Sequence, residues 1–74
     1  MNTETFYTTG RRDCLVAVEV TVHGKGAVAS AELDHITRIQ LLEALQTECP
    51  NYNWTVEAHG NRYFGYWNAY GRLA

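Results

Sequence analysis

The stretch that decides the fold is residues 14–33, which read CLVAVEVTVHGKGAVASAEL. Apolar residues alternate with others along both halves of this stretch, which is typical of two half-buried strands. The glycines around Lys25 predict a two-residue turn, Gly24-Lys25, between them. The predicted pairs are Val22 with Ala27, Val20 with Ala29, Val18 with Ala31 and Val16 with Leu33. A slip of one residue would instead set valines opposite polar residues such as Ser30 and Glu32.

A helix is predicted directly after this hairpin. Asp34 is a good N-cap residue, and Pro50 requires the helix to end at or before Cys49. The helical spacing predicts about four turns. Its apolar face would consist of Ile36, Ile39, Leu42, Leu45 and Cys49, with Leu41 at the margin. Such a helix would cover the valine face, where the paired alanines leave room for it.

A second hairpin is predicted after the helix, with strands at residues 54–58 and 62–70 and a type II′ turn at Gly60-Asn61. This turn pairs Ala58 with Tyr63, Val56 with Gly65 and Trp54 with Trp67 on the face under the helix. The opposite face then has nothing left in the chain to cover it. It would carry Thr55, Glu57, His59, Arg62, Phe64, Tyr66, Asn68 and Tyr70.

Upstream, residues 3–9 have the composition of a strand, and residues 10–13 predict a turn toward the valine strand. The sequence therefore predicts an α+β fold in a single domain, residues 1–74. It would be an antiparallel sheet of about five strands in the order β-β-β-α-β-β, with one amphipathic helix packed on one face. The position of the first strand in the sheet stays open.

Composition excludes several classes of protein. The chain has 74 residues, 46% of them hydrophobic, and a net charge of −2, which excludes a disordered chain and a strongly basic nucleic-acid binder. No apolar run reaches the length of a membrane span. Residues 1–6 have neither the basic nor the apolar region of a secretory signal, so we expect none. With only two distant cysteines, Cys14 and Cys49, we expect a cytoplasmic protein, although a disulfide between them stays open.

The sequence offers little catalytic chemistry. Ser30 is the only serine and has no recognisable base, and Cys49 would end a helix, where the dipole disfavours a thiolate. The histidines, His23, His35 and His59, and the cysteines show no metal-ligand spacing. We therefore expect no enzyme, no metal and no cofactor.

Residues 62–67, Arg-Tyr-Phe-Gly-Tyr-Trp, resemble the aromatic RNP1 stretch of the RNA-recognition motif. In that resemblance Phe64 and Tyr66 are the stacking rings, and Arg62 is the basic residue. Tyr63 stands where the family has its first glycine, and that family's order of strands and helices differs from the one predicted here. The resemblance implies single-stranded RNA binding by stacking on the open face, which is the alternative function.

The favoured function is a small non-enzymatic protein-binding module. The predicted contact residues are Arg62, Phe64, Tyr66, Tyr70, His59 and Glu57, since tyrosine, phenylalanine and arginine commonly anchor interfaces. The mildly acidic chain suits a basic protein partner, and a homodimer through the first strand stays open. In size and architecture the chain resembles accessory and inhibitor proteins of phages and mobile elements, including anti-CRISPR proteins. That likeness implies occlusion of a surface on a host protein.

Overall fold

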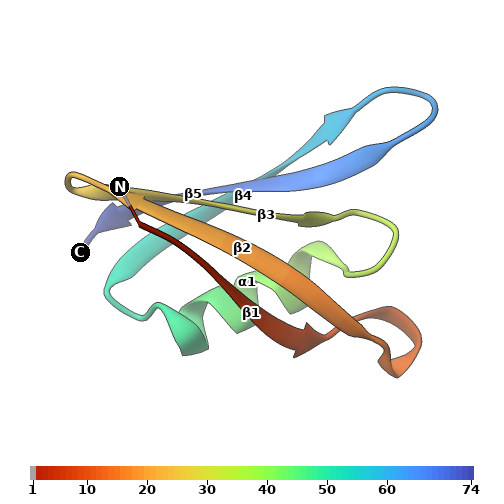
Figure 1. The fold of residues 1–74 in the computed structure, drawn as a ribbon, viewed down its shortest axis with the longest axis horizontal. Coiled ribbons are helices and arrows are strands. Elements are labelled where there is room, and N and C mark those ends of the chain that lie inside the picture. The colour runs from red at the N-terminus through yellow and green to blue at the C-terminus, as the bar shows by residue number, and fades with distance from the viewer. Residues whose placement is uncertain (1) are drawn as a thin grey trace.

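The computed structural model describes residues 2–74, which form five strands and one α-helix. The elements are β1 (Asn2–Thr9), β2 (Leu15–His23), β3 (Gly26–Glu32), α1 (Arg38–Glu48), β4 (Tyr52–Gly60) and β5 (Gly65–Leu73), with a short 3-10 turn, η1 (Arg11–Asp13), after β1. The predicted α+β fold and the order β-β-β-α-β-β are confirmed. Figure 1 shows the helix on one side of the sheet.

All neighbouring strands are antiparallel, and their order in the sheet is β1-β2-β3-β5-β4. The first three strands follow one another as a meander, and α1 then carries the chain to the far edge. There β4 turns back into β5, which fills the place beside β3. The first strand, whose position the sequence left open, is therefore an edge strand paired with β2, and β4 is the other edge.

The first hairpin has the predicted register over its paired part, but the predicted pairs of Val18 with Ala31 and of Val16 with Leu33 lie outside the ladder. Val22 lies opposite Ala27, and Val20 lies opposite Ala29. Gly24 in the turn has φ +58°, a backbone conformation that favours glycine. The valine and alanine side chains of this hairpin form much of the buried core: Val16, Val18, Val20, Ala27, Ala29 and Ala31.

The predicted register of the second hairpin is wrong by four residues. Trp54 lies opposite Gly71, Val56 opposite Ala69 and Ala58 opposite Trp67. The hairpin closes through a four-residue loop, residues 61–64, instead of a two-residue turn, and the last pair of the ladder is Gly60 with Gly65. A shift by an even number leaves the side chains that remain in the strands on their predicted faces. Tyr63, predicted under the helix opposite Ala58, lies instead in the loop and is exposed. Gly65, Trp67, Ala69 and Gly71 therefore all share the face under the helix.

The side chain of Asn61 explains the longer loop. Its Oδ1 accepts hydrogen bonds from the backbone N–H of Tyr63 at 2.8 Å and of Phe64 at 3.1 Å. The N–H of Asn61 itself donates to the carbonyl of Phe64 at 2.9 Å. An asparagine that bonds to the backbone ahead of it is a common way to build such a loop. Arg62 and Phe64, which were predicted in the strand, therefore belong to the loop.

The helix begins later than predicted. Its N-cap is Thr37, not Asp34, because Thr37 and Gln40 form a capping box. The Gln40 N–H donates to Thr37 Oγ1 at 3.1 Å, and the Thr37 N–H donates to Gln40 Oε1 at 3.0 Å. The helix thus has 11 residues, about three turns, and ends at Glu48 just before Cys49 and Pro50.

The buried face of the helix also differs from the prediction. Leu41, Ala44 and Leu45 are buried, whereas Ile39 is 67% exposed. Ile36 is fully buried, but it lies in the loop before the helix and not on the helical face. Moving the helix start from residue 34 to Thr37 leaves Ile36 to fill the core from the turn before the helix.

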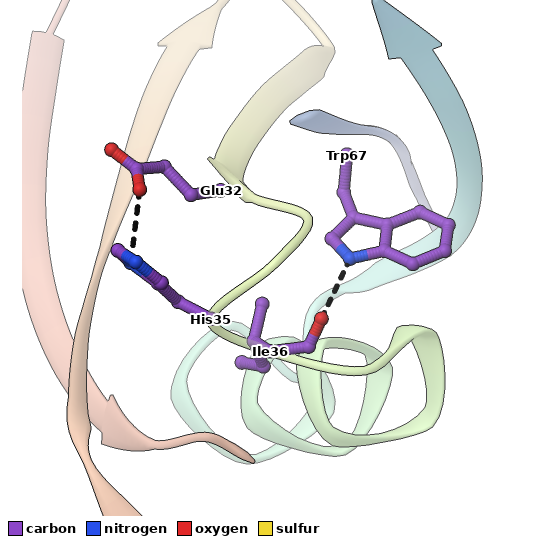
Figure 2. A network of polar contacts seen from close by, with 4 residues as sticks. All are labelled: Glu32, His35, Ile36 and Trp67. Carbon is purple, nitrogen blue, oxygen red and sulfur yellow. Dashed lines mark hydrogen bonds and ion pairs between the residues drawn. The ribbon is translucent and has the colours of Figure 1, made fainter. Parts of the chain in front are cut away.

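Two tryptophans of the sheet donate hydrogen bonds to the backbone just before and just after the helix. The indole N–H of Trp67 donates to the Ile36 carbonyl at 2.8 Å, just before α1 (Figure 2). The indole N–H of Trp54 donates to the Cys49 carbonyl at 3.1 Å, just after α1. Both rings thus pack against the core while their polar atoms are bonded, which fixes the helix across this face.

No helix within residues 2–74 has the length and apolar character to cross a membrane. Both cysteines are free thiols. Cys14 is exposed, and Cys49 is partly buried at the end of the helix. The disulfide that the sequence left open does not form in this structure.

Candidate functional site

The face of the sheet opposite α1, here called the open face, is the candidate site. Strand pairing arranges its side chains in rows that cross the sheet. One row is Thr3, Thr21, Val28, Tyr70 and Thr55. The next is Thr5, Glu19, Ser30, Asn68 and Glu57. In the third, Tyr7 faces Ala17, and Glu32, Tyr66 and His59 follow on the other strands.

Four of the six predicted site residues come together on this face. Tyr66 of β5 lies between His59 of β4 and the loop residue Phe64. The rings of His59 and Tyr66 are stacked at 5.8 Å between centroids with a 19° angle, and those of Phe64 and Tyr66 are tilted at 5.9 Å and 31°. Glu57 Oε2 lies 3.4 Å from His59 Nε2. The shift of the hairpin register therefore keeps these groups adjacent.

The other two predicted residues lie apart from this cluster. Tyr70 is on the open face, 40% exposed, but its neighbours across the ladder are Val28 and Thr55. Arg62 is in the loop, where its guanidinium lies 5.8 Å from the centre of the Tyr63 ring. Tyr63 is 86% exposed, so this pair stands in solvent at the tip of the hairpin. Figure 1 shows this tip reaching past the helix.

The structure adds residues that were not predicted for the site. A shallow depression of about 500 Å³ opens on this face between β2, β3 and β5. Two rings, Phe64 and Tyr66, and two carboxylates, Glu19 and Glu32, line it. Its remaining surface is made by the small or polar residues Ala17, Ser30, Ala31 and Asn68.

Glu19, Ser30 and Glu32 were missed because they come from the first hairpin. The alternation along residues 14–33 already assigns Glu19, Ser30 and Glu32 to the side away from the valines. That signal gives their face but not their neighbours. The pairing of β3 with β5 makes them neighbours of Tyr66 and Asn68.

Glu32 has a partner at the rim of the depression. His35 Nδ1 lies 2.9 Å from Glu32 Oε2, and both side chains are about half exposed, 55% for His35 and 53% for Glu32. Figure 2 shows this contact on one side of the β3–α1 loop and the Trp67–Ile36 hydrogen bond on the other. Solvent screens an exposed pair of this kind strongly, so it contributes little to stability.

The open face carries more negative than positive charge. Glu19, Glu32 and Glu57 lie on three of its strands. Among residues 2–74, the only arginine or lysine in its strands is Arg72, at the end beyond Tyr70, where it lies opposite Gly26 and Asn53. Neither ion pairs nor hydrogen bonds engage the Glu19 carboxylate within the described chain.

Residues with metal-binding or nucleophilic chemistry do not gather at the site. Within residues 2–74 no group of three or more His, Cys, Asp or Glu side chains is placed to hold a metal ion. The pKa of the Cys49 thiol is raised above its ordinary value by partial burial, and further by the nearby carboxylates of Glu48 and Glu4. Cys49 belongs to the helix side of the sheet, so it does not face the site.

Comparison of the chain with protein families, with curated proteins and with solved structures found no match. The residues and geometry of the open face therefore carry the functional argument alone.

Proposed function

We propose that the protein is a non-enzymatic protein-binding module that covers a surface of a partner protein with its open face. The observation that carries this proposal is the one-sided core. The single helix covers one face of the sheet, and no other element of residues 2–74 packs across the opposite face. On that face Tyr7 of β1 is 66% exposed, and Phe64, in the loop before β5, is 54% exposed. Exposed aromatic side chains on a rigid sheet are typical of protein interfaces.

The shape of the face supports a protein partner. Its rings are held at fixed positions, since Tyr66 is stacked on His59 and contacts Phe64, so little conformational freedom is lost on binding. Polar side chains such as Ser30 and Asn68 surround these rings and can bond to a partner's backbone. The open face thus combines apolar anchors with a polar surround.

The charge of the face favours a basic protein over a nucleic acid. Single-stranded nucleic acid needs cations along its phosphates as well as rings for its bases. Here the rings lie among Glu19, Glu32 and Glu57, and Arg62 points into solvent at the hairpin tip. These carboxylates repel phosphates and attract a basic surface.

In its finer form, the proposal is that the partner is a host protein and that the chain inhibits it by occlusion. The likeness to small phage and mobile-element inhibitors, anti-CRISPR proteins among them, supports this form. The proposal also puts the protein in the cytoplasm. The free thiols of Cys14 and Cys49 agree with a reducing compartment.

The test is a comparison of three chains in a pull-down from the native host, followed by affinity measurement with the purified partner. The double variant Phe64→Ala/Tyr66→Ala removes the two adjacent rings. The control, Ile39→Ala, removes an exposed apolar side chain from the helix instead. We expect wild type and control to bind the same protein equally. We expect the double variant to lose it, by tenfold or more in Kd, because aromatic anchors contribute about 2 kcal/mol or more.

Circular dichroism and thermal unfolding of each variant accompany this comparison. Equal retention of the partner by the folded double variant would show that the open face is not the interface. Titration with single-stranded RNA at low and high salt tests the alternative function. Salt-sensitive quenching of tyrosine or tryptophan fluorescence would replace the protein-binding proposal by nucleic-acid binding.

A further inference from the structure

From the depression on the open face we infer the chemistry of the partner's contact: it receives an arginine side chain of the partner between the Tyr66 ring and the carboxylates of Glu19 and Glu32. This inference rests on the proposed function and names the group that the open face recognises. It combines three features of the same depression, namely its volume, its aromatic wall and its charge.

The aromatic wall of the depression is formed by Tyr66 and Phe64. Tyr66 lies opposite His59 on its β4 side and opposite Glu32 on its β3 side. His59 is stacked on Tyr66, so the β4 side of the ring is occupied. The side toward β3 borders the depression together with Phe64. A flat cationic group can lie against such a ring surface at cation–π distance.

The carboxylates stand on the other side of the same space. Glu19 and Glu32 both line the depression, and each is exposed. Glu19 has no bonding partner within residues 2–74, and the Glu32 carboxylate is shared only with the exposed His35. A cation placed there therefore meets two acceptors without displacing a buried ion pair.

A guanidinium fits this arrangement better than an ammonium group. It is planar, so it can stack on the Tyr66 ring while its edge donates two parallel hydrogen bonds to one carboxylate. A lysine can make the charge interaction but not the stacked, two-pronged contact. The volume of about 500 Å³ accommodates a long side chain together with water.

The experiment uses the whole chain and three capped tripeptides, which have arginine, lysine or citrulline in the central position. Citrulline has nearly the same shape as arginine without the charge. Amide shifts of the protein are followed by NMR at low salt. We expect saturable shifts at Glu19, Ser30, Glu32 and Tyr66 with the arginine peptide, weaker shifts with lysine and none with citrulline.

The variant Glu19→Gln/Glu32→Gln tests the carboxylates, and Glu43→Gln, an exposed carboxylate on the helix, is the control for net charge. We expect the double variant to bind the arginine peptide about tenfold more weakly, since each exposed charge contact contributes up to about 1 kcal/mol. The control should bind like wild type. Equal binding of arginine and citrulline, or equal loss in the control, overturns the inference.

The same variants separate this inference from the proposed function. If Phe64→Ala/Tyr66→Ala loses the partner protein but Glu19→Gln/Glu32→Gln keeps it at full affinity, the open face is an interface that does not use an arginine. The inference is then wrong and the proposed function stands. If both variants keep the partner, both are wrong.

Discussion

At the scale of single residues, the ring of Trp54 packs directly against Gly71. The two residues lie opposite each other on β4 and β5, and the indole occupies the space where a side chain of residue 71 would begin. A Cβ built at residue 71 would lie 2.9 Å from the Trp54 ring. The same indole bonds to the Cys49 carbonyl, so the ring cannot move without loosening the end of the helix.

We predict that Gly71→Ala destabilises the protein by about 1–3 kcal/mol, the usual cost of an overpacked core. Gly26→Ala on the neighbouring strand is the matched control. Its added Cβ would have its nearest atom 3.4 Å away, and we expect a change within about 0.5 kcal/mol. Urea unfolding of the three proteins measures the difference. Equal midpoints for the two variants would show that the indole does not lie on Gly71.

The two thiols are predicted to differ in reactivity. Cys14 is exposed, whereas Cys49 is partly buried and its pKa is raised by burial and by Glu48 and Glu4. At mildly alkaline pH the thiolate fraction of Cys49 is therefore lower than that of an ordinary thiol. Iodoacetamide, which reacts with the thiolate, should modify the exposed Cys14 first. Mass spectrometry of proteolytic fragments measures both rates, with the urea-unfolded chain as control. Faster modification of Cys49 in the folded protein would contradict this prediction.

The raised pKa of Cys49 also makes the stability of the protein depend on pH. A thiol whose pKa is higher in the folded state ionises first in the unfolded state as the pH rises. The contribution of the neutral Cys49 thiol is therefore complete below its ordinary pKa and is lost as the pH rises through the folded value. As the pH rises above the ordinary thiol pKa, we expect the free energy of unfolding to fall less in the Cys49→Ala variant than in wild type. Urea unfolding of both proteins across this pH range measures the difference.

At the scale of elements, the helix start shows what the sequence could and could not predict. The apolar periodicity indicated a helix correctly, and Pro50 marked its end. The start was wrong because Asp34 and Thr37 are both good N-cap residues, and Ile36 fits the periodicity from either. The deciding contact is distant in sequence. The Ile36 carbonyl accepts the indole N–H of Trp67, while the Gln40 N–H, its partner in a longer helix, donates to Thr37 Oγ1.

We predict that Thr37→Ala lowers the stability of the protein by about 1 kcal/mol, because the capping box is lost. Asp34→Ala is the control, and its effect should stay within about 0.5 kcal/mol, since Asp34 is exposed and caps no helix. Thermal unfolding of both variants gives the comparison. A larger effect of Asp34→Ala would mean that the helix begins where the sequence first suggested.

In the second hairpin, too, the sequence predicted one feature correctly and another wrongly. Alternation along residues 54–58 and 65–71 determines which side chains face the helix, and that part of the prediction is correct. Alternation has a period of two, so it cannot distinguish a register from one shifted by four residues. The true register depends on how Asn61 bonds its own loop and on where the Trp54 ring finds space.

At the scale of the whole molecule, the helix covers only part of the sheet's length, and the tip of the β4–β5 hairpin reaches beyond it (Figure 1). We predict that amide hydrogens in residues 61–64 exchange about two or more orders of magnitude faster than those of the buried parts of β2, β3 and β5. Hydrogen exchange followed by NMR measures this. Comparable protection at the tip would mean that it packs against the rest of the chain.

The composition of the candidate site also depends on the arrangement of the whole molecule. The sequence alone predicted the rings of the second hairpin, because Tyr66 and Phe64 are close together in the chain. It could not predict that Glu19 and Glu32 lie beside them, because this depends on β5, and not β4, pairing with β3. No local pattern in residues 52–73 decides which strand of that hairpin becomes the edge.

That strand order has a consequence for synthesis. β5 bridges the meander and β4, so neither the edge strand β4 nor the start of α1 has its full set of partners before β5 is in place. A ribosome releases β1 to β4 first, and until residues 65–73 follow, β4 has no neighbouring strand and the Ile36 carbonyl before α1 lacks its indole donor. We therefore expect the complete sheet to form only after β5 has been synthesised.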